Sequence, residues 1–201
     1  MSELAAEGPA PAHRTLRDIA DELLEYQRVE YIYDGVLSIM TPLGFSHGAI
    51  VHLIVEAIVQ APLRGQTSVD WSMRTGNFQL NRIDDPQKFF IPDIAVAYPG
   101  SRDNLEFREN LAMVVEITSP KSPDTVQNDY GIKAKQYAKA GIPCYLLVDQ
   151  EQGSWTVYAL DGGWPGYQVY GSGKYGAPVK LPEPFGFELP TDEWPPYSDE
   201  S

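Results

Sequence analysis

The sequence lacks several features that would directly assign it to a disulfide-rich, membrane or secreted class of protein. Cys144 is the only cysteine among 201 residues, so no disulfide can form within the chain. Proteins of reducing compartments rarely need disulfides, and we therefore expect a cytoplasmic location. No run of 18 apolar residues occurs, so we expect no membrane-spanning helix. The first residues have no basic start followed by an apolar stretch, so we expect no secretory signal.

Basic residues are scarce as well. The chain has 15 Lys and Arg against 28 Asp and Glu, for a net charge of −13. A nucleic-acid-binding protein usually carries a basic footprint. Any contact with DNA must therefore come from a local patch or a metal ion, and tight unspecific binding without metal is disfavoured.

The length fits one domain with a sizeable core. Composition predicts a disordered segment over 1–13, a single domain over 14–190 and an acidic tail outside the core over 191–201. Apolar residues at helical spacing predict three helices. The first begins at Thr15, which caps LRDIADELLEYQ, and the second spans 46–61 with Ser46 as its cap. The third spans 124–140 and ends before Gly141.

Short β-rich runs make up most of the rest. Two of them flank Asp34-Gly35, which is a strong hairpin signal. Three apolar runs are typical of buried strands, namely PDIAVAY, LAMVVEIT and IPCYLLVD. Two later runs indicate a closing antiparallel hairpin, namely SWTVYAL and YQVYG. The order of these elements predicts an α/β (α+β) fold with a central mixed β-sheet flanked by helices.

Two carboxylates, Asp93 and Glu116, lie within apolar runs, where charged residues are unusual. Asp93 follows Pro92 at the start of an apolar strand, where it either caps a turn or points into a site. Glu116 follows five apolar residues, and a buried carboxylate is costly unless it is paired or bound to a metal. It either reaches solvent at the sheet end or lies opposite Asp93 on a neighbouring strand.

Lys133 is the third unusual charge. Helical spacing places it on an apolar stripe with Tyr130 and Tyr137, whereas Lys135 points about 200° away, toward solvent. A lysine in such a stripe either snorkels to an edge or contacts carboxylates. Asp129 and Tyr137, at i−4 and i+4, are placed to support it by an ion pair and by packing.

These residues form an acid–acid–lysine set, which predicts metal-dependent hydrolysis. Asp93 and Glu116 would bind Mg²⁺ or Mn²⁺, with water and phosphate oxygens in the other positions. Lys133 would orient the attacking water or neutralise the transition state. No nucleophile is evident, since Cys144 lies inside an apolar strand. Because like charges repel at a metal site, we expect removal of Glu116 to leave the apo fold intact.

A string of motifs then resembles a known family. It consists of Pro92-Asp93, EITSP at 116–120, Asp129-x3-Lys133-x3-Tyr137 and AGIPCYLLVD, with an early YDG hairpin followed by SIMTP. From about Tyr31 to Leu189 the chain is similar to the Uma-two family, of restriction-endonuclease type, within the PD-(D/E)XK nuclease superfamily.

The resemblance implies a restriction-endonuclease-like fold, with Asp93 and Glu116 as metal ligands. The parent superfamily has its lysine two positions after the acid, where this chain has Thr118. The resemblance is therefore to variants in which a helix supplies the lysine, here Lys133. It also suggests Glu30 as an additional acid near the metal. His47, at a helix start, either faces the site or is a capping or core residue.

Three functions are compatible with these residues. The first is a DNA endonuclease that hydrolyses phosphodiester bonds, with a homodimer expected because restriction-type enzymes often pair two sites. The second is a degenerate nuclease fold that binds nucleic acid or a protein without cutting. The third is hydrolysis of another phosphate ester, since the set recognises metal and phosphate and not deoxyribose.

Overall fold

The computed structural model describes most of the chain. The described residues are 15–23, 29–33, 36–39, 44–76, 78–101, 108–118 and 129–197, with the backbone alone at 29–33, 36–39, 108 and 129–130. The expected disordered segment 1–13 lies outside them, as does the turn Asp34-Gly35.

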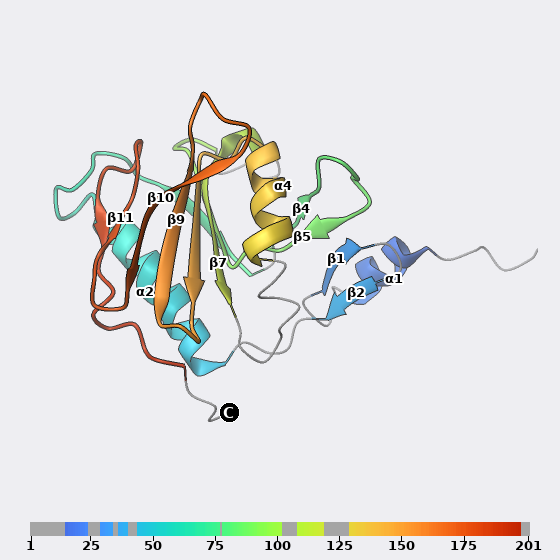
Figure 1. Ribbon diagram of the computed structural model, residues 1–201, viewed down its shortest axis with the longest axis horizontal. Helices are drawn as coiled ribbons and strands as arrows, with labels where there is room; N and C mark the ends of the chain where they lie inside the picture. The colour runs from blue at the N-terminus through green and yellow to red at the C-terminus, as the bar shows by residue number, and fades with distance from the viewer. Residues whose placement is uncertain are drawn as a thin grey trace, which may run out of the picture.

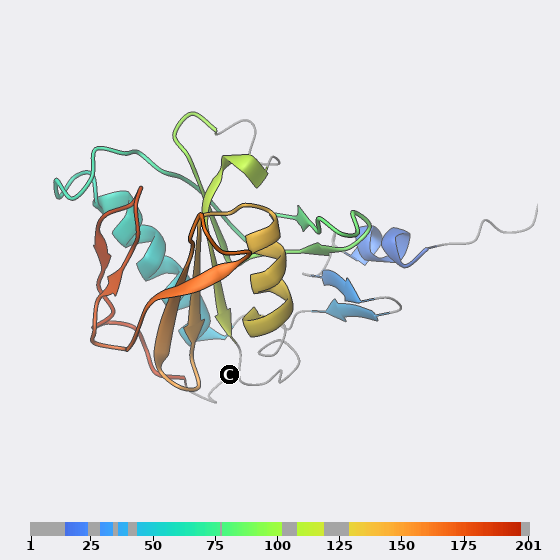
Figure 2. The same cartoon turned by 45° about the horizontal axis from the view of Figure 1, so that its top comes forward.

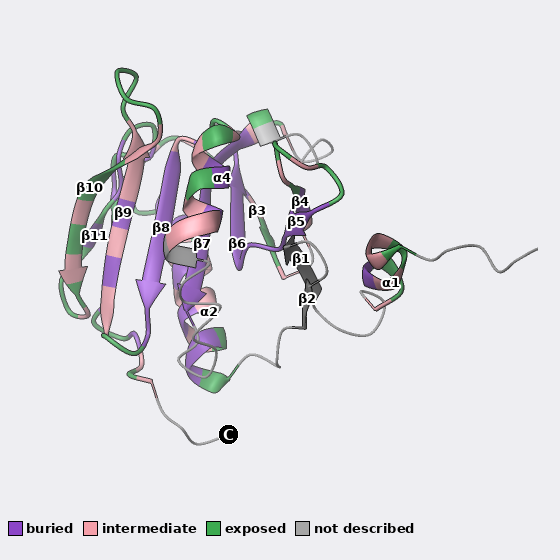
Figure 3. Cartoon of the chain, turned by 45° about the vertical axis from the view of Figure 1, so that its right-hand side comes forward, coloured by how far each residue is buried: buried purple, intermediate pink, exposed green. Residues whose placement is uncertain are grey.

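A six-stranded sheet forms the centre of the fold, in the order β10-β9-β8-β7-β6-β3. Its strands are β3 (Ser72–Thr75), β6 (Ile94–Ala97), β7 (Leu111–Thr118), β8 (Cys144–Asp149), β9 (Ser154–Leu160) and β10 (Tyr167–Lys174). β7 and β8 pair in parallel, and the other neighbours pair antiparallel. The sheet is therefore mixed, as predicted. Every residue of β7 and β8 is buried, which explains their continuous apolar runs (Figure 3).

Helices cover both faces of this sheet (Figure 1). α2 (Phe45–Gln60) packs Ile50, Ile54 and Ile58 against one face. On the other face, α4 (Ala134–Lys139) follows a π-helical turn, η2 (Asp129–Lys133), and buries Tyr137. Gly141 ends this second helix with a φ of +73°, a conformation that glycine adopts without strain. Both helices begin near the carboxyl end of β7 (Figures 1 and 2).

A second sheet, of order β2-β1-β5-β4, lies with α1 to one side of the central sheet (Figure 1). Its elements are α1 (Leu16–Leu23), β1 (Val29–Tyr33), β2 (Val36–Ile39), β4 (Leu80–Asn81) and β5 (Phe89–Phe90). β1 and β2 form the predicted antiparallel hairpin. A short 3₁₀ turn, η1 (Arg108–Asn110), and a pair of antiparallel strands complete the fold. The two strands are β11 (Val179–Lys180) and β12 (Glu188–Leu189).

Of the three predicted helix starts, the one at residue 124 lies outside the described residues, and one of the other two is right. Thr15 caps α1 as expected, because its Oγ1 accepts a hydrogen bond from the Asp18 backbone N–H at 3.2 Å. The prediction that Ser46 caps the next helix is wrong. α2 begins at Phe45, after Gly44, and the Ser46 hydroxyl instead donates to the Pro196 carbonyl at 3.2 Å.

The prediction of an acidic tail outside the core over 191–201 is wrong for residues 191–197. Trp194 is 4% exposed and joins the core on the α2 side, with its ring edge-on to Tyr175. Thr191 Oγ1 accepts from the Gly176 N–H and donates to the Ala177 carbonyl. The acid and proline content of the segment concealed one large apolar anchor. None of the helices in the described ranges has the length and apolar character that a membrane crossing requires.

Candidate functional site

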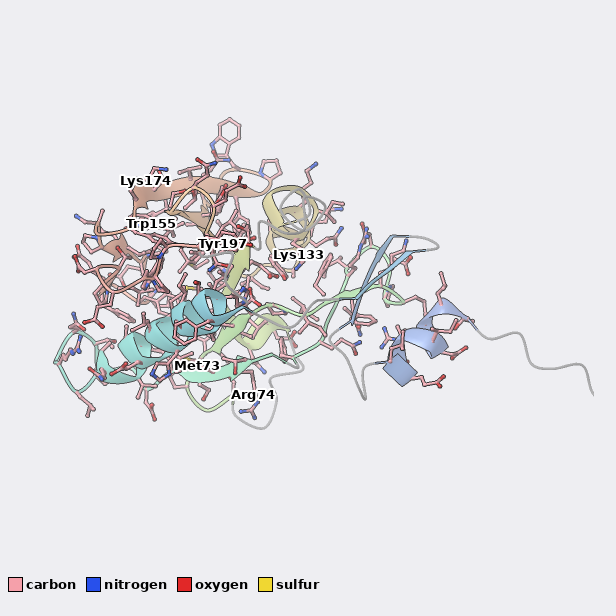
Figure 4. The ribbon with its side chains drawn as sticks, turned by 90° about the horizontal axis from the view of Figure 1, so that it is seen from below. Met73, Arg74, Lys133, Trp155, Lys174 and Tyr197 are labelled. Atoms are coloured by element: carbon pink, nitrogen blue, oxygen red, sulfur yellow. The ribbon has the colours of Figure 1, made fainter. Side chains whose placement is uncertain are left out.

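A buried ion pair lies between β7 and the start of α4. Lys133 Nζ is 3.2 Å from Glu116 Oε1, and the two side chains are 0% and 3% exposed. The Tyr137 hydroxyl donates a 2.5 Å hydrogen bond to the same oxygen. Lys133 and Tyr137 are four residues apart, so both reach Glu116 from one face of the helix. Figure 4 labels Lys133 beside this helix. The prediction that Lys133 turns inward is therefore correct, and Lys135 is exposed as expected.

Asp93 lies beside this pair, at the start of β6. The antiparallel register places Ile94 opposite Val115, which brings Asp93 next to Glu116 on the neighbouring strand. Asp93 Oδ2 accepts a hydrogen bond from the Ile117 backbone N–H at 2.7 Å. The carboxylate is buried, and it is oriented by the strand that carries the second acid.

His47 reaches Asp93 from the opposite helix layer. Its Nε2 is 3.2 Å from Asp93 Oδ1, and both side chains are buried. His47 is the third residue of α2, so the start of this helix faces the site. Of the two roles left open by the sequence, the structure shows the one in which His47 contacts the candidate ligand.

Gln150 is a site residue that the sequence analysis missed. It is 3% exposed and directly follows β8. Oriented to match its neighbours, its amide donates to the Thr118 carbonyl at 3.1 Å and accepts from the His47 backbone N–H at 3.2 Å. It thus connects the ends of β7 and α2. The parallel pairing of Thr118 with Asp149 explains this position, because parallel strands end at the same edge.

Glu30, Asp129 and the position at which the parent superfamily has its lysine need separate comment. Glu30 lies in β1 and Asp129 opens η2, but their side chains lie outside the described ones, so their roles stay predictions. Thr118, where the parent superfamily has its lysine, is fully buried. Lys133 ends the π-helical turn, a feature frequent at functional sites, and contacts Glu116 from across the sheet face.

The donor set suits a hard divalent cation. Two buried carboxylates on adjacent strands offer the oxygen ligands that Mg²⁺ prefers, with water and phosphate oxygens completing the shell. In the described part of the chain, no group of three or more His, Cys, Asp and Glu is arranged to hold a metal ion. Two carboxylates are therefore the set to test. Burial raises the pKa of the Cys144 thiol to about 12, so this cysteine is no nucleophile at neutral pH.

The pairing of Glu116 with Lys133 corrects one expectation. The sequence suggested that removing Glu116 would leave the fold intact, because two carboxylates repel each other. The structure shows an ammonium group within 3.2 Å of Glu116. Removing one partner of a buried pair leaves an uncompensated charge and costs about 3–5 kcal/mol. We now expect Glu116→Ala to destabilise the protein.

A mixed sheet between two helix layers, with two carboxylates and a lysine at one edge, defines a restriction-endonuclease-like fold. The chain matches the family model described as "Uma2: Putative restriction endonuclease" over residues 20–192. It therefore belongs to this family, as its motifs indicated.

A solved structure agrees on the fold. It is a crystal structure from Anabaena variabilis, described as "a putative nuclease belonging to DUF820". It shares 18% sequence identity with this chain at a TM-score of 0.60, and the match covers 87% of this chain and 96% of the other. The predicted fold class is thus confirmed. No curated protein matches the chain at a significant level.

Proposed function

We propose that this protein is a metal-dependent DNA endonuclease that hydrolyses phosphodiester bonds. One observation carries the proposal: a fully buried lysine, Lys133, contacts Glu116 directly beside a second buried carboxylate, Asp93. Burying three ionisable groups at one strand edge is costly for folding alone. Such groups cluster at functional sites.

The residues divide the chemistry among them. Asp93 and Glu116 would hold Mg²⁺ or Mn²⁺, which supplies charge stabilisation at the phosphoryl oxygens and an acidified water. Tyr137 holds Glu116 by its hydrogen bond, and the Ile117 N–H together with His47 orients Asp93. Lys133 would hold the attacking water or offset negative charge that develops in the transition state.

The proposal includes a partner, an assembly and a location. DNA is the expected substrate. A homodimer would place two such sites on the two strands of a duplex. A chain with one buried cysteine and no capacity for an internal disulfide is suited to the reducing cytoplasm.

A second candidate is a nuclease fold that binds nucleic acid or a protein without cutting. The net charge of −13 favours the protein partner over nucleic acid, because unspecific affinity for a duplex depends on basic residues. The presence of Asp93, Glu116 and Lys133 in one cluster favours the hydrolytic function instead.

Nicking of supercoiled plasmid by the purified protein separates the two. We expect relaxed and linear products with Mg²⁺ or Mn²⁺ and none with a chelator in excess. An inactive protein that retains DNA in a gel-shift assay would support the binding function. Nicking that persists in chelator would contradict metal dependence.

A further inference from the structure

The turn of the β9–β10 hairpin lies beside α4 (Figures 1 and 2). Residues of both elements line a groove. It encloses about 760 Å³. It is distinct from the candidate active site, because Lys133 is fully buried and does not line it. None of the residues proposed for catalysis lines it.

The helix wall of the groove is small and basic. Gly131, Ala134 and Ala138 leave room along the helix, and Lys135 and Lys139 lie one turn apart. Lys139 is 55% exposed and 3.6 Å from Asp84, a carboxylate that it shares with Arg82. Small residues bordered by two exposed ammonium groups are suited to a phosphate backbone that passes along the helix.

The hairpin wall is aromatic. Tyr158 and Tyr167 line it, and Trp164 lies at the hairpin turn with 67% of its surface exposed. The other three tryptophans are each 5% exposed or less. Tyr158 and Tyr167 both stack on buried Tyr145, at centroid distances of 5.7 and 5.9 Å, so this wall is rigid.

The charge of the groove differs from that of the chain. Its lining has two lysines and one carboxylate, Asp161, whereas the whole chain has 15 basic and 28 acidic residues. A local basic patch on an acidic protein, beside an exposed aromatic ring such as that of Trp164, is the combination by which proteins bind single-stranded nucleic acid.

We propose that this groove binds a single strand of nucleic acid, with phosphates at Lys135 and Lys139 and a base stacked on Trp164. The inference rests on the proposed nuclease function and extends it. The groove and the site share one helix, which carries Lys133 on its inner face and Lys135 on its outer face. Tyr145 also contacts Tyr137, whose hydroxyl holds Glu116. The turn of the β9–β10 hairpin and the acids lie at opposite ends of the sheet, so a strand that reaches both would run along α4 from Trp164 toward Gly131.

Tryptophan fluorescence provides a selective test, because Trp164 is the exposed one of four. The probe is a deoxyoligonucleotide of about 12 nucleotides, within the site sizes of single-strand binding domains. Chelator is present throughout, so that cleavage plays no part. We expect the probe to protect Trp164 from acrylamide quenching. Trp164→Ala should weaken binding at least about fivefold, since stacking of one base is worth about that much.

The lysines are tested by salt dependence. The double variant Lys135→Gln/Lys139→Gln should reduce the slope of log affinity against log salt by about 1.4, because each single-strand phosphate contact contributes about 0.7. The matched control is Lys174→Gln/Lys180→Gln, which removes the same charge from exposed positions outside the groove. It should leave the slope unchanged.

Three results would overturn the inference: no binding of the probe, binding without protection of Trp164, or equal effects of the groove and control variants. These results are independent of cleavage. If the protein binds the strand through Trp164 but never nicks plasmid, the inference about the groove stands and the proposed nuclease function is wrong. If the protein nicks plasmid with metal but the probe does not protect Trp164, the proposed function stands and the inference about the groove is wrong.

Discussion

The two faces of the central sheet come from the same strands, yet they bury different chemistry. Toward α2, the strands present aliphatic side chains such as Ile94, Val96 and Val115. Toward α4, they present Ala95 and Ala97, which leave room for large side chains from the helix. Tyr137 of α4 and Tyr145 of β8 pack in this cluster, and Lys133 is buried against Glu116 on the same face. We conclude that the α2 face mainly stabilises the fold and that the α4 face mainly holds the candidate site.

The largest expected effect is on catalysis, from Asp93→Asn. The amide keeps the size of the carboxylate and can still accept from the Ile117 N–H, but it removes one negative ligand. We expect the nicking rate at saturating Mn²⁺ to fall at least about 100-fold, as for other single groups that stabilise a transition state. Asp192→Asn, at an exposed carboxylate outside the cluster, is the control and should retain full activity.

The α2 face should respond in stability. Ile54 is completely buried in the aliphatic layer, so Ile54→Ala should lower the free energy of unfolding by about 2–5 kcal/mol. Urea denaturation measures this loss. Val59, on the same helix, is 54% exposed, and Val59→Ala should cost about 0.5 kcal/mol or less. Equal losses in the two variants would contradict the assignment of this face.

Tyr137→Phe tests the α4 face with the loss of one hydroxyl. The ring still packs against Phe90 and Tyr145, but Glu116 loses a hydrogen bond. A hydrogen bond to a charged group is worth about 1.5–3 kcal/mol, so we expect roughly tenfold slower nicking. Tyr170→Phe, at an exposed tyrosine, should behave as wild type. An unchanged rate in Tyr137→Phe would show that Glu116 needs no such support.

The smallest effect concerns a surface cluster outside both faces. The Arg82 hydrogen bond holds the pKa of the Asp84 carboxyl well below its usual range, with contributions from Gln136 and Lys139. A carboxyl whose pKa is lowered by folding stabilises the folded state at pH values above its ordinary pKa. This stabilisation is lost as the pH falls below that value. Because Asp84 is 39% exposed, solvent screening limits its contribution to about 1 kcal/mol or less.

The substitution Asp84→Asn isolates this contribution. The difference in unfolding free energy between wild type and variant should shrink as pH falls from 7 to 3, since the unfolded chain takes up the proton first. Denaturation at the two pH values measures it. A difference that grows toward pH 3 would have the wrong sign for this account.

Sequence patterns predicted the cluster of Asp93, Glu116 and Lys133 because these charges interrupt strong local periodicity. Asp93 and Glu116 stand out against apolar strands, and Lys133 against a helical stripe. These signals need only a window of a few residues. The predicted hairpin and the buried strands rest on equally local patterns.

The features that sequence analysis missed depend on contacts between distant segments. Gln150 reaches the site only because β7 and β8 pair in parallel. The place of β5 beside β1 follows from the pairing of Phe89 with Tyr31, which no local pattern contains. Trp194 enters the core from a segment with the composition of a tail. In each case, tertiary packing overrides the local signal.

The most direct test of the central claim removes both partners of the buried pair at once, in Glu116→Gln/Lys133→Met. Replacing a whole buried ion pair by groups of similar volume is often neutral for stability. The control is Glu188→Gln/Lys180→Met, at an exposed pair 3.7 Å apart. We predict that both double variants fold with stability close to wild type, and that only the buried one loses metal-dependent nicking of plasmid. Wild-type nicking by the folded buried variant would contradict the account.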